Sequence, residues 1–305
     1  MPNGIGYDII KIERELFNTS NKNYRLASNR LDDIVNAVSK NIKSRDEPRK
    51  VLRTISDTLI ELGYRYAADD SCNFQNSLIR KGLVCRDYLG VFLTLGENLG
   101  LPLYAAHVPH HIFVKWEDGN NKLNWETTTP LKIDGKQTID SEVCDHIYID
   151  RFKILPVSIE KGVYLKSLTI NEFMAMPWNE WGLRFSNIGN YKKTIKCYDK
   201  ASELNPKLPD VYTNKGFQLS TRKKVDHEML LELYEKTLEL DFLIVPALYN
   251  KARALSRLGR IQEAKVTVEK ALSAIETRTL YYQGFGKKLE YMKKHFEEEH
   301  LGTKY

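Results

Sequence analysis

The sequence predicts an α+β domain in the first half of the chain and an all-α array of helical repeats in the second half. Three observations lead to this prediction. Residues 1 to about 65 carry apolar residues at helical spacing, residues 101–128 alternate apolar and polar residues as strands do, and residues from 173 onward are helical with an internal repeat. We therefore place the α+β domain with its N-terminal helices at 1–140, a connector at 141–172 and the repeats at 173–305.

The composition is that of an ordinary globular protein. Of the 305 residues, 42% are hydrophobic and 28% are charged, and the formal net charge is +6. Basic and acidic residues alternate in most segments, so the long basic block typical of a nucleic-acid-binding protein is missing, and a nucleic-acid partner is not expected. No stretch reaches the roughly 18 apolar residues that a membrane helix needs, so no membrane partner is expected either.

The cysteines indicate free thiols rather than a metal site. Cys72, Cys85, Cys144 and Cys197 include no C-x-x-C pair, so neither structural zinc nor a disulfide framework is expected. The N-terminal residues lack the apolar run of a signal peptide, and no dense acidic loop suggests calcium. The sequence thus predicts a cytoplasmic protein without a metal or other cofactor, in which a thiol can act as a nucleophile.

Helices are expected before and around the first cysteines. Residues 30–43 and 48–63 each place apolar residues on one face, and the second helix ends at Gly63. Residues 85–100 are expected to form a buried helix that begins at Cys85 and stops at Gly100. Residues 101–108 are a strand candidate.

Residues 111–128 are expected to form a hairpin around an Asp118-Gly119 turn. With that turn, Glu117 pairs with Asn120, and counting outward places His111 opposite Glu126. Directly opposed strand residues have their side-chain bases about 4.5–5.5 Å apart on one face. The hairpin would therefore hold an imidazole beside a carboxylate, which is how a catalytic base is oriented.

The second half of the chain repeats at a helical-pair period. Gly182, Gly216 and Ala252 lie 34 and 36 residues apart and are the small residues that let paired helices approach each other. Tyr198, Tyr234 and Val268 follow at the matching position of each second helix. The pattern resembles the tetratricopeptide consensus, with about three units and a closing helix near 277–299. Such an array either binds a protein or peptide in its groove or braces the neighbouring domain.

Cys85 is the candidate nucleophile. It follows Gly82 and opens a helix, where the helix dipole favours a thiolate. A lone cysteine at a helix start is more often a small buried residue, and a lone strand histidine is more often structural. The order Cys85, His111, Glu126, with the last two in register, is what favours catalysis.

Residues 73–128 resemble the transglutaminase-like superfamily, whose fold is of the papain-type cysteine protease kind. The resemblance is carried by Gly82 and Cys85, the Leu-Gly-Leu-Pro stretch at 99–102, Pro109 and His111 before a Phe-Val-Lys strand, and the Asn-x-Glu-Thr-Thr stretch at 124–128. It is greatest to the bacterial and archaeal branch with C-terminal tetratricopeptide repeats, and extends over about 30–275.

The resemblance implies that Cys85 is the nucleophile, His111 the general base and acid, and Glu126 the group that orients the histidine. Two departures stand out: Arg86 and Asp87 follow the cysteine where small residues are common, and the third residue is a glutamate rather than an aspartate. Gln75 or Asn73 are weak candidates for a side-chain donor to an oxyanion, because ordinary loop polarity is the stronger explanation for each.

The function predicted from these observations is cysteine-dependent acyl transfer or hydrolysis of an amide or peptide. The alternative is a catalytically silent fold that serves as a protein-binding scaffold through its repeats. The sequence leaves the substrate, the choice between hydrolysis and transamidation, and the role of the repeats open.

Overall fold

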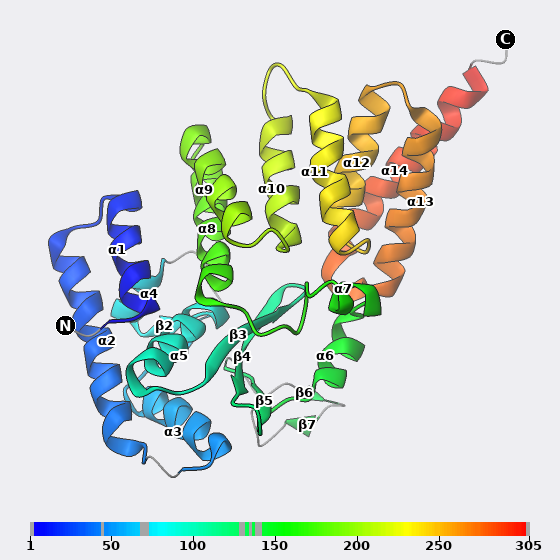
Figure 1. Cartoon of the computed structure of the whole chain (residues 1–305). Helices are drawn as coiled ribbons and strands as arrows, with labels where there is room; N and C mark the ends of the chain where they lie inside the picture. Colours follow the sequence, from blue (N-terminus) through cyan, green and yellow to red (C-terminus); the bar gives the residue numbers. More distant parts are fainter. Residues whose placement is uncertain are drawn as a thin grey trace. The chain divides into compact units, whose positions relative to one another are not determined.

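The computed structural model describes residues 3–43, 46–67, 73–127, 132–133, 136–137 and 142–302 (Figure 1). As predicted, an α+β core is followed by all-α repeats. The first compact unit comprises Met1–Arg151 with Tyr164–Phe173, and the second comprises Phe152–Val163 with Met174–Tyr305. The predicted connector is thus divided between the two units. Cys72 and Thr128, both named in the sequence analysis, lie outside the described residues.

The helices of the first unit precede, interrupt and follow its sheet. They are α1 (Ile5–Phe17), α2 (Asn21–Asn41), α3 (Pro48–Glu61), α4 (Phe74–Arg80), α5 (Cys85–Leu99) and α6 (Asp145–Phe152), whose last residue lies at the unit boundary.

Side chains of α5 bind the start of α1. The first amides of a helix have no partner within the helix itself. Here the Ile5 amide donates to the Glu97 carboxylate at 2.6 Å, and the Gly6 amide donates to the Thr94 hydroxyl at 2.8 Å. A side chain at Gly6 would collide with Thr94, because a Cβ there would lie 2.6 Å from the hydroxyl oxygen. The N-terminal helix is therefore an integral part of this unit.

Helix α4 begins on a buried carboxylate supplied by α1. The amides of Phe74 and Gln75 both donate to Glu13 at 2.9 Å, and Glu13 is buried. Negative charge at this end of a helix complements the positive end of its dipole. Asn73 completes the cap, since its side-chain oxygen accepts from the Asn76 amide at 3.0 Å.

The central sheet is antiparallel, with strand order β3–β4–β5. Its strands are β3 (Leu103–Val108), β4 (His111–Glu117) and β5 (Lys122–Trp125). A tight turn at Pro109-His110 joins β3 to β4, and His110 has a left-handed φ of 60°. Two shorter pairs lie outside this sheet, namely β1 (Arg65–Tyr66) parallel to β2 (Gly82–Leu83), and β6 (Lys132–Ile133) antiparallel to β7 (Lys136–Gln137).

The β4–β5 register differs from the predicted one. Glu117 pairs with Lys122 rather than with Asn120, so the predicted register was wrong by two residues. The turn is centred on Gly119 and Asn120, one position later than expected, and Gly119 has a φ of 86°. An even shift keeps every side chain on its predicted face, because strand faces alternate with a period of two.

Asp118 explains the displaced turn. Its carboxylate accepts hydrogen bonds from the backbone amides of Asn120 and Asn121 at 3.0 and 2.7 Å, and from the Trp116 indole at 2.9 Å. An aspartate that bonds to amides two and three residues ahead opens a turn instead of occupying its centre.

Helix α5 packs against both the sheet and α4 through its glycines. A Cβ at Gly96 would lie 3.1 Å from the Leu103 side chain of β3, and one at Gly90 would lie 3.2 Å from the Phe74 ring. Most of the middle of α5 is buried. This close packing fixes the position of the first residue of the helix, Cys85.

A returning segment of the chain covers the outer edge of β3. The amides of Leu165 and Leu168 donate to the carbonyls of His107 and Ala105 at 3.0 and 2.8 Å. The Lys115 ammonium, which is buried, donates to the Leu165 carbonyl at 2.6 Å. These contacts satisfy an edge that would otherwise expose unpaired backbone groups.

The second unit is built from helices that follow one another in chain order (Figure 1). They are α7 (Pro156–Glu160), α8 (Ile170–Asn187), which starts in the first unit, α9 (Tyr191–Leu204), α10 (Pro209–Ser220), α11 (His227–Leu240), α12 (Val245–Arg257), α13 (Ile261–Thr277) and α14 (Thr279–Gly302).

The small and aromatic positions of the repeat meet as the sequence predicts. A Cβ at Gly182 would lie 2.4 Å from the Tyr198 ring, and one at Gly216 would lie 2.6 Å from the Tyr234 ring. Both tyrosines are buried. In each pair the glycine of the first helix therefore makes the space that the tyrosine of the second helix fills.

A buried ion pair joins distant segments within the second unit. The Arg278 guanidinium donates to Asp241 at 2.7 Å, and both side chains are fully buried. The same guanidinium donates to the Phe152 carbonyl at 3.1 Å and to the Lys153 carbonyl at 3.2 Å. The ion pair thereby attaches the segment before α7 to the repeats.

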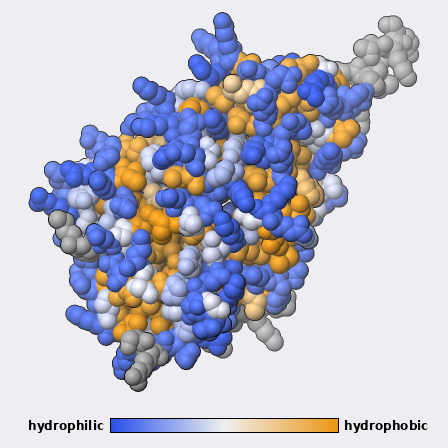
Figure 2. Space-filling view, in the orientation of Figure 1, coloured by the Kyte–Doolittle hydropathy of each residue, from blue (hydrophilic) through white to orange (hydrophobic). Residues whose placement is uncertain are grey.

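Hydrophilic and hydrophobic residues are both present on the visible surface. Figure 2 shows hydrophilic residues over most of the visible face, with hydrophobic residues gathered in smaller patches among them. Among the helices that the structure describes, none combines the length and the hydropathy required to cross a bilayer.

Candidate active site

Cys85 is the first residue of α5. Its neighbour Val84 is the N-cap, and the Val84 amide donates to the Asp87 carboxylate at 3.3 Å, while the Asp87 amide donates back to the Val84 carbonyl at 3.0 Å. Asp87 is buried against the first turn of the helix. Asp87, one of the two residues that depart from the family pattern, thus caps the helix that begins with Cys85. Cys85 itself is partly exposed and forms no disulfide.

His111 is the first residue of β4 and follows directly on the Pro109-His110 turn. Its side chain is 17% exposed. Proline at the first turn position and a left-handed residue at the second define a tight turn that fixes where β4 starts. The turn therefore determines where the imidazole stands.

Glu126 follows the last residue of β5 and is only 2% exposed. One of its carboxylate oxygens, Oε2, lies 2.6 Å from Nε2 of His111. Continuing the observed ladder places Glu126 opposite Phe113, so His111 and Glu126 are diagonal neighbours on one face. The predicted contact is present although the predicted register was wrong, because the error was an even number of residues.

The three candidate residues come together at one place. The Cys85 thiol lies close enough to the His111 ring to raise its pKa, and the Glu126 carboxylate contacts the same ring. Burial is the largest influence on the His111 pKa and lowers it. The hydrogen bonds with Cys85 and Glu126 and the negative charges of both outweigh burial and raise this pKa from 6.5 to about 9. The surroundings of the ring thus favour imidazolium.

Tyr148 of α6 completes the surroundings of the carboxylate, although no sequence pattern predicted this contact. Its hydroxyl donates to Oε2 of Glu126 at 3.4 Å, and its ring stacks on Phe113 with centroids 4.3 Å apart. Burial first, and then the charge of Glu126, raise the pKa of the Tyr148 hydroxyl, so it stays a neutral donor. The Thr127 amide donates to the other carboxylate oxygen at 3.0 Å.

The two candidate oxyanion donors have structural partners. The Gln75 side-chain amide donates to the Ile10 carbonyl at 2.7 Å, and its oxygen accepts from the Thr19 hydroxyl at 2.9 Å. Asn73 caps α4. Their predicted role toward an oxyanion stays a prediction, and these contacts account for both residues without it.

The two histidines near His111 differ from it in their surroundings. His110 occupies the turn. His107 pairs with Ile112 and is fully buried, with its ring edge-on to Tyr164 at 5.3 Å and no hydrogen-bond partner for either ring nitrogen among the described residues. Burial lowers the pKa of His107 to about 4. His107 therefore does not share the carboxylate contact that marks His111.

No group of three or more histidine, cysteine, aspartate or glutamate side chains suited to a metal ion occurs within the described residues.

Two known families match parts of the chain. Residues 25–155 match the family model of the transglutaminase-like superfamily, and residues 245–277 match that of the tetratricopeptide repeat. The chain contains a transglutaminase-like domain. Cys85, His111 and Glu126 all lie within the matched part of the transglutaminase-like domain, and α12 with α13 forms the matched tetratricopeptide repeat.

Several solved structures of helical repeats are also similar to part of this chain. The tetratricopeptide domain of Arabidopsis OM64 is 18% identical, covering 42% of this chain and 98% of that one with a TM-score of 0.37. The TPR2B domain of yeast Sti1, in its complex with pHsp70, is 15% identical, covering 43% and 99% with a TM-score of 0.37. The Yersinia enterocolitica type III secretion chaperone SycD, with a peptide of the translocator YopD, is 12% identical, covering 41% and 94% with a TM-score of 0.38.

Proposed function

We propose that the protein is a cysteine-dependent enzyme that transfers an acyl group or hydrolyses an amide or peptide bond, with Cys85, His111 and Glu126 as its catalytic residues. The observation that carries this proposal is the continuous chain of contacts from the Cys85 thiol through the His111 ring to the Glu126 carboxylate. A nucleophile, a base and a group that orients the base are what acyl transfer through a thioester requires.

The first step follows from this arrangement. The Cys85 thiolate attacks the carbonyl carbon, a C–S bond forms and the carbonyl electron pair moves to oxygen. When the tetrahedral intermediate collapses, the C–N bond breaks and the His111 imidazolium gives its proton to the leaving amine. Glu126 holds the ring in place and stabilises its positive charge. A thioester on Cys85 and a neutral His111 remain.

The second step uses the same residues in reverse. His111 takes a proton from water or from an acceptor amine, which attacks the thioester and releases Cys85. Water gives hydrolysis and an amine gives transamidation. The Cys85 amide at the start of α5 is the proposed backbone donor to the oxyanion, with Gln75 and Asn73 as the weaker side-chain candidates.

The helical repeats are proposed to bind a protein or peptide. Stacked helix pairs form an extended surface suited to such ligands. A cytoplasmic location, where thiols stay reduced, belongs to the same proposal.

Competitive alkylation of the cysteines tests the catalytic part. Full-length protein is treated with limiting iodoacetamide near neutral pH, and mass spectrometry follows each cysteine. Cys85 should react faster than Cys144, although Cys144 is exposed and Cys85 only partly so. His111→Gln should slow the labelling of Cys85 alone. Buried Cys197 serves as the slow reference, and burial also raises the pKa of its thiol.

Equal or slower labelling of Cys85 than of Cys144 or Cys197 would contradict the catalytic proposal. The alternative, a catalytically silent fold that serves as a scaffold through the repeats, would then stand. A positive result would lead to a second measurement, release of ammonia or amine from a glutamine- or amide-containing peptide library, with Cys85→Ser as the inactive control.

A further inference from the structure

A hollow of about 740 Å³ lies in the second unit between α12 and α14. Its rim carries Arg253 and Arg257 from α12, and Lys287 and Lys288 from α14; no acidic residue is among the residues that line it. The two arginines are one helical turn apart and so project from the same face of α12. We call this feature the α12–α14 hollow.

The basic side chains of the α12–α14 hollow are not neutralised within the described part of the chain. None of the four forms an ion pair with a described residue, whereas other cations of this unit do. Lys215 pairs with Asp199 at 2.7 Å, and Lys251 of α12 pairs with Glu235 at 3.0 Å. These two lysines thus have carboxylate partners, whereas the four cations of the hollow have none among the described residues.

Tyr249, Met292 and Phe296 give the hollow an apolar and aromatic lining. Tyr249 of α12 also meets Phe285 of α14 edge to face at 5.6 Å, and this contact joins the two helices. Arg253 lies over the Tyr249 ring at 5.8 Å and Lys288 over the Phe285 ring at 5.5 Å. Tyr291, 74% exposed, extends this apolar surface. A ligand with both acidic and apolar side chains would find partners for each.

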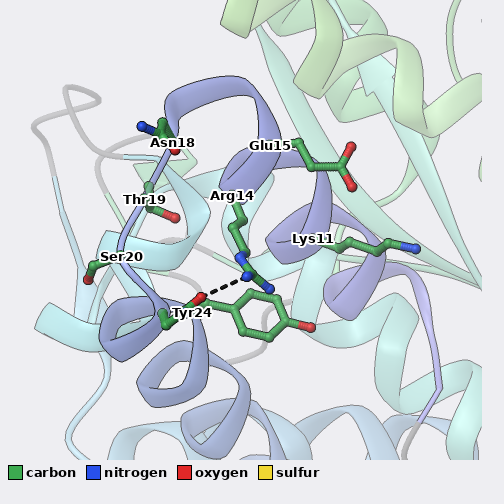
Figure 3. Close-up of a pocket in the computed structure, with 8 residues that line it drawn as sticks. Lys11, Arg14, Glu15, Asn18, Thr19, Ser20 and Tyr24 are labelled. Carbon is green, nitrogen blue, oxygen red and sulfur yellow. Dashed lines mark hydrogen bonds between the residues drawn. The ribbon is translucent and has the colours of Figure 1, made fainter.

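A hollow in the first unit is also lined by basic residues, but its arginine already has partners within the protein. It lies where α1 meets α2, and there the Arg14 side chain points toward Tyr24 of α2 (Figure 3). It donates to the Asn21 side chain at 2.7 Å and lies over the Tyr24 ring at 4.8 Å. Its neighbour Lys11 is offset by Glu15, one turn along α1 and also on the rim. Two cations and one carboxylate thus line that hollow, whereas four cations and no carboxylate line the α12–α14 hollow.

We infer that the α12–α14 hollow binds an acidic segment of a partner protein, in which carboxylate side chains alternate with apolar ones. This inference deepens the proposed role of the repeats and is independent of the chemistry at Cys85. Guanidinium groups match carboxylates through paired hydrogen bonds, while ammonium groups add charge without fixed geometry. The apolar side chains of the segment would rest on Tyr291 and Met292.

The distribution of charge favours a peptide over a nucleic acid. The four cations meet in one hollow of a size that holds a few side chains. A nucleic-acid surface instead needs positive charge spaced along a track, with several phosphate contacts. On the adjoining helix α11, the Glu235 carboxylate pairs with Lys251 of α12 and would repel phosphates.

Fluorescence anisotropy on the full-length protein tests the inference. The probe is a fluorescein-labelled peptide of glutamate pairs separated by single leucines, and its neutral counterpart has glutamine at each glutamate. The acidic peptide should bind, the neutral one should bind at least about tenfold more weakly, and added salt should weaken binding of the acidic one. Lys287→Gln with Lys288→Gln should weaken binding about tenfold, and so should Arg253→Gln with Arg257→Gln.

A matched control uses lysines outside the hollow. Lys265→Gln with Lys270→Gln on α13 removes the same net charge and should leave the affinity unchanged. The inference is overturned if this control weakens binding as much as the hollow variants, if the neutral peptide binds as tightly, or if an oligothymidine binds more tightly than the acidic peptide. Cys85→Ser should bind normally, so fast labelling of Cys85 without peptide binding would remove this inference and leave the catalytic proposal standing.

Discussion

The contact between His111 and Glu126 explains how a mostly buried imidazole can keep a proton. Burial opposes the charge, yet the carboxylate 2.6 Å away and the nearby thiol more than offset it and raise the pKa to about 9. A folded-state pKa above the ordinary value of 6.5 means that the native state binds the proton more tightly than the unfolded chain. The resulting stability is fully present below pH 6.5 and is lost as pH rises through about 9.

Glu126→Gln should lower the pKa of His111, because the amide keeps the shape of the side chain but removes its charge while burial remains. An NMR titration of the His111 ring in the full-length variant measures this shift. The alkaline loss of stability between pH 6.5 and 9 should shrink in parallel. A His111 pKa that stays near 9 in the variant would show that Cys85 alone holds the proton on the ring.

His107 should give the opposite pH dependence. Both ring nitrogens are buried without a hydrogen-bond partner among the described residues, its ring packs on Tyr164, and its pKa is lowered to about 4. The negative charge of Glu172 opposes this shift but is outweighed by burial. The unfolded chain therefore takes up the proton first, and stability falls as pH drops from 6.5 toward 4.

His107→Phe should remove this acid sensitivity while filling the same space. Urea unfolding at pH 7 and pH 5 should show a loss of about 2 kcal/mol attributable to His107 in the natural protein and none in the variant. Since carboxylates with ordinary pKa values change little over this range, they provide a small common background. An equal pH dependence in the two proteins would contradict the assignment to His107.

At the scale of helices and strands, the predictable features are those set by nearby residues. The repeat could be predicted because Gly182 and Tyr198 meet within one helix pair, and both are close in sequence. The contact of His111 with Glu126 could be predicted because strand faces alternate, which survives an even error in register. The register itself could not be predicted, because it depends on the hydrogen bonds that the Asp118 carboxylate accepts from the turn amides.

Gly216→Ala should destabilise the second unit by about 1–3 kcal/mol, because the new methyl group would lie 2.6 Å from the Tyr234 ring. The third helix pair has Ala252 with Val268 at the matching positions, which suggests the compensating change. Tyr234→Val alone should leave a cavity, and the double variant should lose less stability than the sum of the two single variants.

Gly284→Ala in α14 is the control for this test. Nothing lies within 4 Å of a Cβ at that position, so the substitution should be neutral or slightly stabilising through helix propensity. Urea unfolding measures the free energy of unfolding of the natural protein and of these four variants. If Gly216→Ala proves as harmless as Gly284→Ala, the helices are not held together as closely as the glycine–tyrosine contact requires.

At the scale of the whole molecule, the contacts that join distant parts of the chain could not be predicted from the sequence. Tyr148 reaches Glu126 from a helix inside the stretch predicted as a connector. Arg278 and its carbonyl partners Phe152 and Lys153 are 125 or 126 residues apart. No periodicity links such positions, because their pairing depends on how complete units pack rather than on any local pattern.

The fully buried pair of Arg278 and Asp241 should therefore be the most sensitive point of the second unit. Arg278→Met leaves an uncompensated carboxylate and two carbonyl groups without their donor, and should cost about 3–5 kcal/mol in unfolding free energy. Asp241→Asn should cost less, since the amide oxygen still accepts a hydrogen bond. The double variant should be clearly more stable than the sum of the two losses predicts, because it buries no unpaired charge. Hydrogen exchange in α11 and α13 measures the effect locally, and purely additive losses would mean that the two side chains act independently.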